Sequence, residues 1–568
     1  MIAFNLGQYQ NRIEAALIEM RQERILERIW WHDHTVWKPE PEEISNRLGW
    51  LHSAGTMRSA LPEIQALVDS VRQAGYTQAL LLGMGGSSLA PEVFRKTFGV
   101  QPGYLDLAVL DSTDPGAVLA YARQFDPARS LYIVSTKSGG TVETFSFYKY
   151  FYNQALEALG SERAGEHFIA ITDPGSRLAE IGREHGFRAV FLNDPHIGGR
   201  YSALSYFGLL PAALVGLEVS TLLERAHALA SQSKKPRESD DQGAILGAAL
   251  GELAKAGRDK LTLLVSPQIA SFGDWLEQLI AESTGKGGQG ILPVVGEQLG
   301  PAEVYGQDRL FVSIQLEGDP QPEEALQALE GAGHPLVRVR LQDKYDLGGQ
   351  FFLWELATAV AGYRLSINPF DQPDVEAAKV LARQMVSAYQ AQGSLPEPEP
   401  DLVAGGLRVY ADPQLAGDLG QERASPAQAL LAFLEHAQPG AYLALQAYVQ
   451  PSAEVGAALT ALRHQLQAYT RLATTVGYGP RFLHSTGQLH KGDAGLGFFI
   501  QITADSPEDA PIPDEAGSPG SSISFAVLKA AQALGDRQAL LEAGRRVLRF
   551  HFTSDVAAGL LELRRALT

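Results

Sequence analysis

Short apolar runs separated by helical stretches characterise the middle of the chain. Between residues 77 and 215 they lie at 79–82, 106–110, 131–134, 168–171 and 189–192. Such runs, without a regular polar alternation, are typical of strands buried on both faces of a parallel sheet whose crossover connections are helices. The pattern therefore predicts a first α/β domain over residues 77–230.

The same pattern returns after a polar segment at 231–243. Four further apolar runs lie at 261–265, 291–295, 310–316 and 336–341. They predict a second α/β domain over residues 240–391. The segment Gln392 to Pro400, which is rich in proline and glutamate, is typical of a linker.

The two ends of the chain differ from this middle. Residues 1–76 carry apolar side chains at helical spacing, among them Ile13, Leu17 and Met20, and predict an N-terminal helical segment. Residues 401–568 combine three expected strands with helices; the strands are at 407–410, 442–448 and 496–503. The predicted fold class is α/β, with two parallel-sheet sandwich domains, the N-terminal helical segment and an additional α+β C-terminal region.

Composition narrows the classes of function. The chain has 568 residues, a formal net charge of −18 and no cysteine. The excess of acidic residues argues against a nucleic-acid partner, because binding to a phosphate backbone normally requires a basic surface. Without cysteine there is no disulfide, thiol nucleophile or cysteine-ligated metal. No apolar run of about 18 residues and no signal peptide is evident, so we expect no membrane contact and a cytoplasmic location.

Two loops that follow expected strands suit a phosphate group. One loop is Gly83-Met84-Gly85-Gly86-Ser87-Ser88, and the other is Ser135-Thr136-Lys137-Ser138-Gly139-Gly140-Thr141. Glycines let backbone amides approach an anion, and a following helix N-terminus adds its positive dipole end. The alternatives are a tight structural turn for the first loop and a Ser/Thr helix cap for the second. Because parallel sheets bind ligands at their carboxyl edge, the two loops together favour a phosphate site.

Two charged residues lie beside glycine-rich breaks. In WLEQLIAESTGKGGQ (275–289), Glu282 lies where an apolar helical pattern gives way to glycines. The Gly-Lys pair here does not complete a nucleotide-binding P-loop, which also requires an earlier glycine and a following Ser or Thr. In Gly198-Gly199-Arg200, the glycines allow the guanidinium to approach a substrate and to stabilise an oxyanion. The alternatives are a surface glutamate and a surface arginine paired with Asp194 or Glu184.

Five ordered segments resemble the signatures of the phosphoglucose isomerase family: LLLGMGGSSLAPE, STKSGGTVET, GGRYSALS, QLIAESTGK and NPFDQPDVEAAK. RIWWHDHTVW, NRLGWL and GPRFLHSTGQLHKG extend the similarity and resemble the isomerase half of transaldolase/phosphoglucose isomerase fusion proteins. Because only residues 1–76 precede the first α/β domain, we expect no transaldolase barrel. The resemblance implies two sugar isomerase (SIS) domains, no cofactor or metal, and a homodimer.

The resemblance also implies an activity, the reversible isomerisation of glucose 6-phosphate to fructose 6-phosphate through a cis-enediol(ate). Glu282 matches the family's base, which moves a proton between C2 and C1, and Arg200 matches the arginine that steadies the enediolate. Lys379 matches a lysine near the ring oxygen. The other matches are substrate-binding positions, namely Gly86, Ser87, Thr136, Ser138 and Thr141 for the phosphate and Gln278 for the sugar.

The chain departs from the family at a histidine that assists ring opening. The corresponding stretch, Glu303 to Arg309, contains no histidine. Asp308 is one candidate for that place, and His484 and His490 in the C-terminal loop GPRFLHSTGQLHKG are the others. We expect His490 to be catalytic and His484 to bind substrate. Two alternatives to the function are a dual phosphoglucose/phosphomannose isomerase and a SIS-domain sensor that binds sugar phosphates without turnover.

Overall fold

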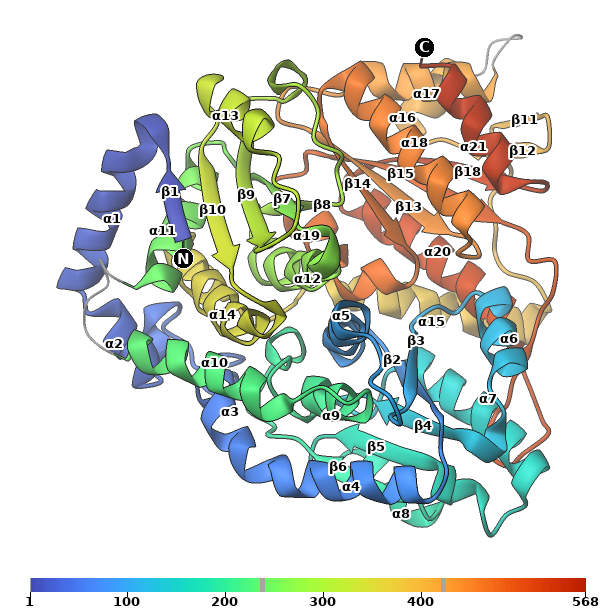
Figure 1. The fold of residues 1–568 in the computed structure, drawn as a ribbon. Coiled ribbons are helices and arrows are strands. Elements are labelled where there is room, and N and C mark those ends of the chain that lie inside the picture. Colours follow the sequence, from blue (N-terminus) through green and yellow to red (C-terminus); the bar gives the residue numbers. More distant parts are fainter. Residues whose placement is uncertain (1, 235–240, 420–424, 568) are drawn as a thin grey trace.

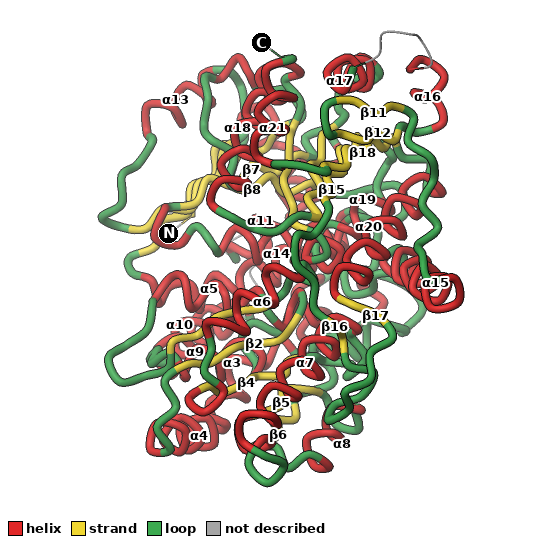
Figure 2. Tube along the Cα trace, turned by 90° about the vertical axis from the view of Figure 1, so that its right-hand side faces the viewer, coloured by secondary structure: helices red, strands yellow, loops and turns green. Residues whose placement is uncertain are grey.

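The computed structural model describes residues 2–234, 241–419 and 425–567, so the expected polar loop at 231–243 lies partly outside the described residues. Three large sheets with helices packed around them form the molecule (Figure 1). Two of the sheets lie in the upper half of the view, and the third lies below them; a view turned by 90° shows the same stacking (Figure 2). No helix within the described ranges combines the length and the apolar character that crossing a membrane requires.

The first α/β domain contains a wholly parallel sheet in the order β3-β2-β4-β5-β6. Its strands are β2 (Gln78–Gly83), β3 (Asp106–Leu110), β4 (Ser130–Ser135), β5 (Phe168–Thr172) and β6 (Ala189–Leu192). All five expected strands are confirmed. Ala79 to Leu82 of β2 expose no surface, because helices cover both faces of the sheet. The helices are α5 (Leu89–Phe98), α6 (Pro115–Gln124), α7 (Val142–Leu159), α8 (Arg177–Glu184), α9 (Tyr206–Leu214) and α10 (Val219–Ser233).

The second sheet has the order β1-β10-β9-β7-β8. The four expected strands are confirmed and parallel: β7 (Lys260–Val265), β8 (Leu292–Val295), β9 (Arg309–Leu316) and β10 (Leu336–Leu341). β1 (Ile2–Asn5) adds an antiparallel edge strand beside β10, so the N-terminal segment is not purely helical as expected. The helices are α11 (Gln242–Lys255), α12 (Phe272–Thr284), α13 (Glu323–Gly331), α14 (Leu347–Arg364) and α15 (Val375–Gln392).

The C-terminal region contains a mixed sheet in the order β11-β12-β18-β15-β13-β14. Four of its strands are parallel: β13 (Tyr442–Tyr448), β14 (Ala473–Tyr478), β15 (Gly497–Ala504) and β18 (Arg546–Phe552). The hairpin of β11 (Leu402–Ala404) and β12 (Leu407–Tyr410) adds antiparallel strands. The region expected to be α+β is therefore built around parallel strands, because β14 and β18, which the apolar pattern did not indicate, complete a third α/β sheet.

Helices surround this third sheet and the N-terminal side of the molecule. Those of the C-terminal region are α16 (Pro413–Leu419), α17 (Pro426–Glu435), α18 (Ala453–Thr470), α19 (Gly487–Gly492), α20 (Phe525–Glu542) and α21 (Val556–Arg565). The N-terminal helices are α1 (Gln10–Gln22), α2 (Ile25–Trp30), α3 (Trp50–Thr56) and α4 (Leu61–Gln73). A short hairpin of β16 (Pro511–Ile512) and β17 (Ile523–Ser524) closes the loop between these two strands, and Asn153 of α7 binds that loop.

The second and third sheets share a hydrophobic core. Ala281 of α12 and Val294 of β8 pack in one buried cluster with Ala444, Leu489 and Phe499 of the C-terminal region. This burial holds α19 against the end of α12, and the close approach explains two glycines. A Cβ at Gly285 would lie 2.3 Å from the Cα of Leu489, and one at Gly492 would lie 2.4 Å from the oxygen of Gly285. The C-terminal region is thereby fixed beside the helix that carries Glu282.

Candidate active site

A cavity of about 610 Å³ opens where loops of the first domain face α12, α15 and the C-terminal region. Its lining includes ten of the eleven sequence-predicted site residues, namely Gly86, Ser87, Thr136, Ser138, Thr141, Arg200, Gln278, Glu282, Lys379 and His484. Segments up to 398 residues apart in the chain, from Gly86 to His484, therefore meet in one place. The exception is His490, which does not line this cavity.

The first phosphate loop depends on two glycines. Gly85 has a φ of +55°, and a Cβ there would lie 2.8 Å from the Nε2 of Gln278. At Gly86 a Cβ would lie 2.0 Å from the carbonyl oxygen of Gly199, beside Arg200. Only glycine allows these backbones to approach so closely, and the backbone amides of the loop then lie at the cavity wall. The loop is a structural turn and a cavity wall at once.

The second phosphate loop precedes α7. Thr141 occupies the N-cap position of this helix, but its hydroxyl makes no capping hydrogen bond. Instead it lies 3.0 Å from the hydroxyl of Thr136. A Ser/Thr cap would have used the Thr141 oxygen for a backbone amide of the first turn, so the alternative of a simple helix cap is not what the structure contains. The uncapped N-terminus of α7 and the two hydroxyls point to an anion site.

Lys137 of the same loop connects it to two neighbouring segments. Its ammonium forms an ion pair with Asp173 and donates a hydrogen bond of 2.9 Å to the carbonyl oxygen of Pro195. It thus ties the second phosphate loop to the segments that follow β5 and β6. Arg47 of the N-terminal segment also lines the cavity, and Glu43 holds its guanidinium through both carboxylate oxygens. Arg47 was not among the expected site residues, and the only signal for it in the sequence was its place in the NRLGWL segment.

Glu282 lies in the last turn of α12, and 13% of its side chain is exposed. Its two carboxylate oxygens have different neighbours. The Nη1 of Arg200 lies 3.4 Å from Oε1, and the Nε2 of Gln278 donates a hydrogen bond of 3.1 Å to Oε2. Gln278 also donates to the carbonyl oxygen of His484 at 2.8 Å. The carboxylate is thus oriented at the cavity wall and keeps lone pairs for a proton.

Arg200 is held by several partners at once. Its Nε donates to the hydroxyl of Ser283 at 2.8 Å, and its Nη2 donates to the carbonyl oxygens of Pro369 and Asp371 at 2.7 and 2.9 Å. Its Nη1 donates to the Oε1 of Gln372 at 2.9 Å. With one N–H of Nη1 left toward Glu282, the planar guanidinium is a fixed charge at the cavity wall. The surface pairing with Asp194 or Glu184 is excluded, because 3% of the residue is exposed.

Gln372 and Lys286 are supporting residues. Gln372 lines the cavity beside Arg200, and the only signal for it in the sequence was its place in the NPFDQPDVEAAK segment. The ammonium of Lys286 binds both the carbonyl oxygen and a carboxylate oxygen of Asp371, at 2.5 and 2.7 Å. Burial and the charge of Arg200 lower the pKa of Lys286 to about 8. Lys286 therefore stabilises the loop that holds Arg200 and does not line the cavity.

His484 reaches the cavity from the C-terminal region. Its Nε2 donates a hydrogen bond of 2.9 Å to the Oε1 of Glu143, in the first turn of α7. The same oxygen accepts a hydrogen bond of 2.7 Å from Gln532, whose own carbonyl accepts one of 2.8 Å from Thr113. Burial raises the pKa of Glu143, but the charge and hydrogen bond of His484 outweigh it, so the pKa lies below its usual value. When the imidazole of His484 is neutral, the hydrogen bond to an ionised Glu143 places its proton on Nε2 and leaves Nδ1 able to accept one.

The other candidates for the missing histidine lie elsewhere. His490 is buried among the rings of Tyr442, Phe482 and Phe499, and its Nδ1 lies 3.3 Å from the Nε2 of Gln446. Burial lowers the pKa of His490 well below its usual value. Asp308 precedes β9, at the amino edge of the second sheet, and also does not line the cavity. The structure therefore places His490, which was expected to be catalytic, outside the lining of the cavity, because its ring is enclosed within the C-terminal core.

Lys379 lies on α15 at the boundary between two cavities. The second cavity, of about 540 Å³, shares Lys379 and His484 with the first and continues between α7, α15 and α20. Its walls are largely apolar and include Val375, Ala382 and Leu528. Lys379 and His484 therefore line the same two cavities.

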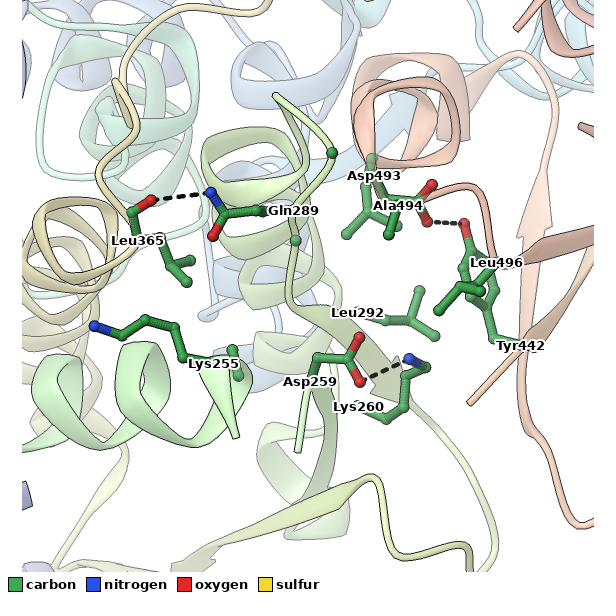
Figure 3. A pocket seen from close by; sticks show the side chains of 14 residues that line it. Lys255, Asp259, Lys260, Gln289, Leu292, Leu365, Tyr442, Asp493, Ala494 and Leu496 are labelled. Atoms are coloured by element: carbon green, nitrogen blue, oxygen red, sulfur yellow. Dashed lines mark hydrogen bonds and ion pairs between the residues drawn. The ribbon is translucent and has the colours of Figure 1, made fainter. Parts of the chain in front are cut away.

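A smaller cavity of about 180 Å³ lies behind the loop that follows Glu282, between the second and third sheets (Figure 3). None of the sequence-predicted site residues lines it. Its charged groups are paired: Lys260 with Asp259 at 2.7 Å, and Asp493 with the hydroxyl of Tyr442 at 2.9 Å. Among the described residues, no group of three or more His, Cys, Asp or Glu side chains is arranged to hold a metal ion. The candidate active site is thus the larger cavity around Glu282.

Comparisons with known proteins show which family the chain resembles. The family described as "Phosphoglucose isomerase" matches residues 58–296. The chain is 28% identical to a glucose-6-phosphate isomerase from Rubrobacter xylanophilus, over 62% of this chain and 95% of that protein. It is 30% identical to a glucose-6-phosphate isomerase from Thermosynechococcus vestitus, over 56% of this chain and 68% of that protein.

Two solved structures share the fold. A hypothetical protein from Thermus thermophilus superposes with a TM-score of 0.57 at 25% identity, covering 68% of this chain and 99% of that one. A glucose-6-phosphate isomerase from Chlamydia trachomatis gives the same TM-score of 0.57 at 18% identity, covering 70% of this chain and 89% of that one. At 18% identity, the similarity to the Chlamydia trachomatis structure shows a shared fold only.

Proposed function

The chain belongs to the phosphoglucose isomerase family, and from that premise we propose that it interconverts glucose 6-phosphate and fructose 6-phosphate. The observation that carries the proposal is the convergence of Glu282, Arg200 and His484 with two glycine- and hydroxyl-rich loops in one cavity. A phosphate monoester fits the two loops, where hydroxyls and helix N-termini supply neutral donors. A sugar of six carbons then extends toward Glu282.

Ring opening is the first step, because the substrate enters as a cyclic hemiacetal. The Nδ1 of His484 accepts the proton of the C1 hydroxyl, while the ammonium of Lys379 donates a proton to the ring oxygen as the C1–O5 bond breaks. Glu143 stabilises the imidazolium that forms, as the hydrogen bond of 2.9 Å between the two side chains supports. All of these residues come from a single chain, and the homodimer and the cytoplasmic location remain predictions.

Proton transfer between the carbons is the second step. The carboxylate of Glu282 takes the proton from C2, and the electron pair of that bond forms the enediolate while negative charge develops on O1. The guanidinium of Arg200 stabilises this charge from its fixed position. The proton on O2 then passes to O1, Glu282 returns its proton to C1, and C2 becomes the carbonyl carbon of the ketose. A cis-enediolate allows one carboxylate to serve both carbons, since C1 and C2 present the same face to it.

Isomerisation in heavy water tests the proposal directly. With purified protein, glucose 6-phosphate and fructose 6-phosphate are expected to reach the same equilibrium mixture, with solvent deuterium appearing at C2 of the aldose and C1 of the ketose by NMR. Mannose 6-phosphate forms a second arm, and its conversion at a comparable rate would identify a dual phosphoglucose/phosphomannose isomerase. Saturable binding without conversion or deuterium uptake would instead indicate a sensor and refute the proposal.

His484→Asn is expected to slow ring opening by about 10²-fold, because a neutral amide cannot accept and release a proton. The variant should still bind the acyclic enediolate mimic 5-phosphoarabinonate with nearly unchanged affinity. NMR exchange between the α and β anomers of glucose 6-phosphate measures the step.

Asp308→Asn is the matched control, because Asp308 was a candidate for the same role but does not line the cavity. It should keep the wild-type rate of anomerisation. Equal rates in His484→Asn and wild type would exclude His484 as the ring-opening group.

A further inference from the structure

The segment that carries His484 extends from the C-terminal region to the substrate cavity. It follows β14 of the third sheet and runs through Arg481 to Ser485 before α19 begins. Of the described residues that line the substrate cavity, His484 is the one that the C-terminal region contributes. The position of this imidazole therefore depends on how the loop is attached to the two α/β domains.

Two polar contacts attach the loop to α12. Gln278 donates to the carbonyl oxygen of His484 at 2.8 Å, and the hydroxyl of Ser485 lies 3.4 Å from the Oε1 of Glu277. Asp274, Gln278 and Glu282 are spaced by four residues, so they share one face of the helix. The His484 loop therefore contacts the same face of α12 that carries the candidate base Glu282.

Arg481 adds a charged contact to both α/β domains. Its Nε lies 3.3 Å from the Oδ2 of Asp111, which follows β3 of the first sheet. Its Nη2 lies 3.8 Å from the Oδ2 of Asp274 on α12 of the second domain. Asp111 in turn lies 3.5 Å from the hydroxyl of Ser88, in the first phosphate loop. One guanidinium from the C-terminal region therefore bridges the two domains beside the loop of His484.

Carboxylates outnumber cations around the guanidinium of Arg481. The charges of Asp111, Asp274, Glu92 and Glu277 act on its guanidinium, and Arg463 is the other cation that acts on Glu277. Burial lowers the pKa of Arg481, but the carboxylates outweigh it and hold the pKa above its usual value. Burial and the charge of Asp274 raise the pKa of Glu277 to about 7. The surplus of carboxylates therefore holds the Arg481 guanidinium at this junction.

We propose that Arg481 is a positioning residue for ring opening, which fixes the His484 loop against both α/β domains. Arg481 does not line the substrate cavity, so it acts through His484 and not on the sugar. The inference rests on the proposed role of His484 in the isomerase reaction. A displacement of about 1 Å in a catalytic group is enough to cost roughly 10²-fold in rate, so the attachment matters for chemistry and not only for stability.

The test separates ring opening from proton transfer. In a Glu282→Gln background, where isomerisation is blocked, NMR exchange measures the anomerisation of glucose 6-phosphate alone. Arg481→Gln is expected to lower this rate by roughly 10- to 100-fold, and Arg481→Lys, which keeps the charge, should recover at least half of the loss on a logarithmic scale. The Kd of 5-phosphoarabinonate should change by less than about threefold, since its binding does not need ring opening.

Arg546→Gln is the matched control. Arg546 is another half-buried arginine of the C-terminal region, paired with Asp412 at 2.6 Å, and neither residue lines the substrate cavity. It should leave anomerisation and the Kd at the values of the background enzyme. This control shows whether the loss of any such ion pair in the region is sufficient to slow ring opening.

Three results would overturn the inference. Unchanged anomerisation in Arg481→Gln would show that the loop is positioned without the ion pairs. An equal loss of anomerisation and of 5-phosphoarabinonate affinity, or an equal loss in Arg546→Gln, would assign Arg481 a general structural role. Failure of the proposed function is distinguishable, because the wild-type protein would then not isomerise glucose 6-phosphate at all.

Discussion

Glu282→Gln is expected to reduce isomerisation of glucose 6-phosphate by about 10⁴-fold, the upper end of what a general base contributes. Glutamine preserves the shape of the side chain and its contacts with Arg200 and Gln278, but it has no lone pair basic enough to accept the C2 proton. Anomerisation should continue at nearly the wild-type rate, because ring opening is assigned to His484 and Lys379. Coupled isomerisation assays and NMR exchange between the α and β anomers of glucose 6-phosphate measure the two activities separately.

Glu218→Gln is the control, because it makes the same substitution away from the cavity. Glu218 does not line the cavity and accepts a hydrogen bond from the nearby hydroxyl of Ser220. Its isomerisation rate should equal that of the wild type. If Glu282→Gln kept more than about one hundredth of the wild-type rate, the assignment of the base would be wrong.

Arg200→Gln is expected to produce the second largest loss, about 10³-fold in kcat, because removing a fixed donor from a developing oxyanion costs this much in other enzymes. The charge of the guanidinium acts on the enediolate and less on the bound sugar. The affinity for 5-phosphoarabinonate, whose carboxylate mimics the enediolate, should therefore fall with kcat, while KM should change by less than about tenfold. Steady-state kinetics and calorimetric titration provide the two measurements.

Arg200→Lys distinguishes charge from geometry. Lysine keeps a positive charge but cannot bind Ser283, Gln372 and the carbonyl oxygens of Pro369 and Asp371 at once. It should recover only a small part of the lost rate. Recovery to within about threefold of the wild type would show that the multiple contacts of Arg200 are not required for catalysis.

Most of the strands of the two α/β domains could be predicted from the sequence. Their apolar runs are continuous, and continuous apolar runs are buried on both faces in any parallel sheet. The strands that were missed are of another kind. β18 carries Arg546 and Arg549 within its run, and Arg549 is buried only because it forms an ion pair with Glu397 and covers the ring of Tyr410. Because these partners are distant in the chain, the local sequence of β18 shows apolar and charged residues together and does not indicate a buried strand.

Within the site, the sequence predicted best those residues that lie in glycine-rich turns or at the end of a helix. Gly86 and the hydroxyls of the two phosphate loops are confirmed as cavity residues, because a glycine-rich turn at the end of a parallel strand lies at the carboxyl edge whatever surrounds it. Glu282 also lies in the cavity, at the junction of helix and loop that the apolar pattern indicated.

The sequence by itself indicated the three segments that form the two phosphate loops and carry the candidate base, because each contains glycines or hydroxyls beside the end of a strand or helix. Only the tertiary structure decided between His484 and His490. The two residues lie six positions apart in similar surroundings of sequence, yet one faces Glu143 in the cavity and the other is enclosed by Tyr442 and Phe499. The difference arises from the docking of the C-terminal sheet on α12 and β8, a burial of apolar surface between distant segments that no local pattern specifies.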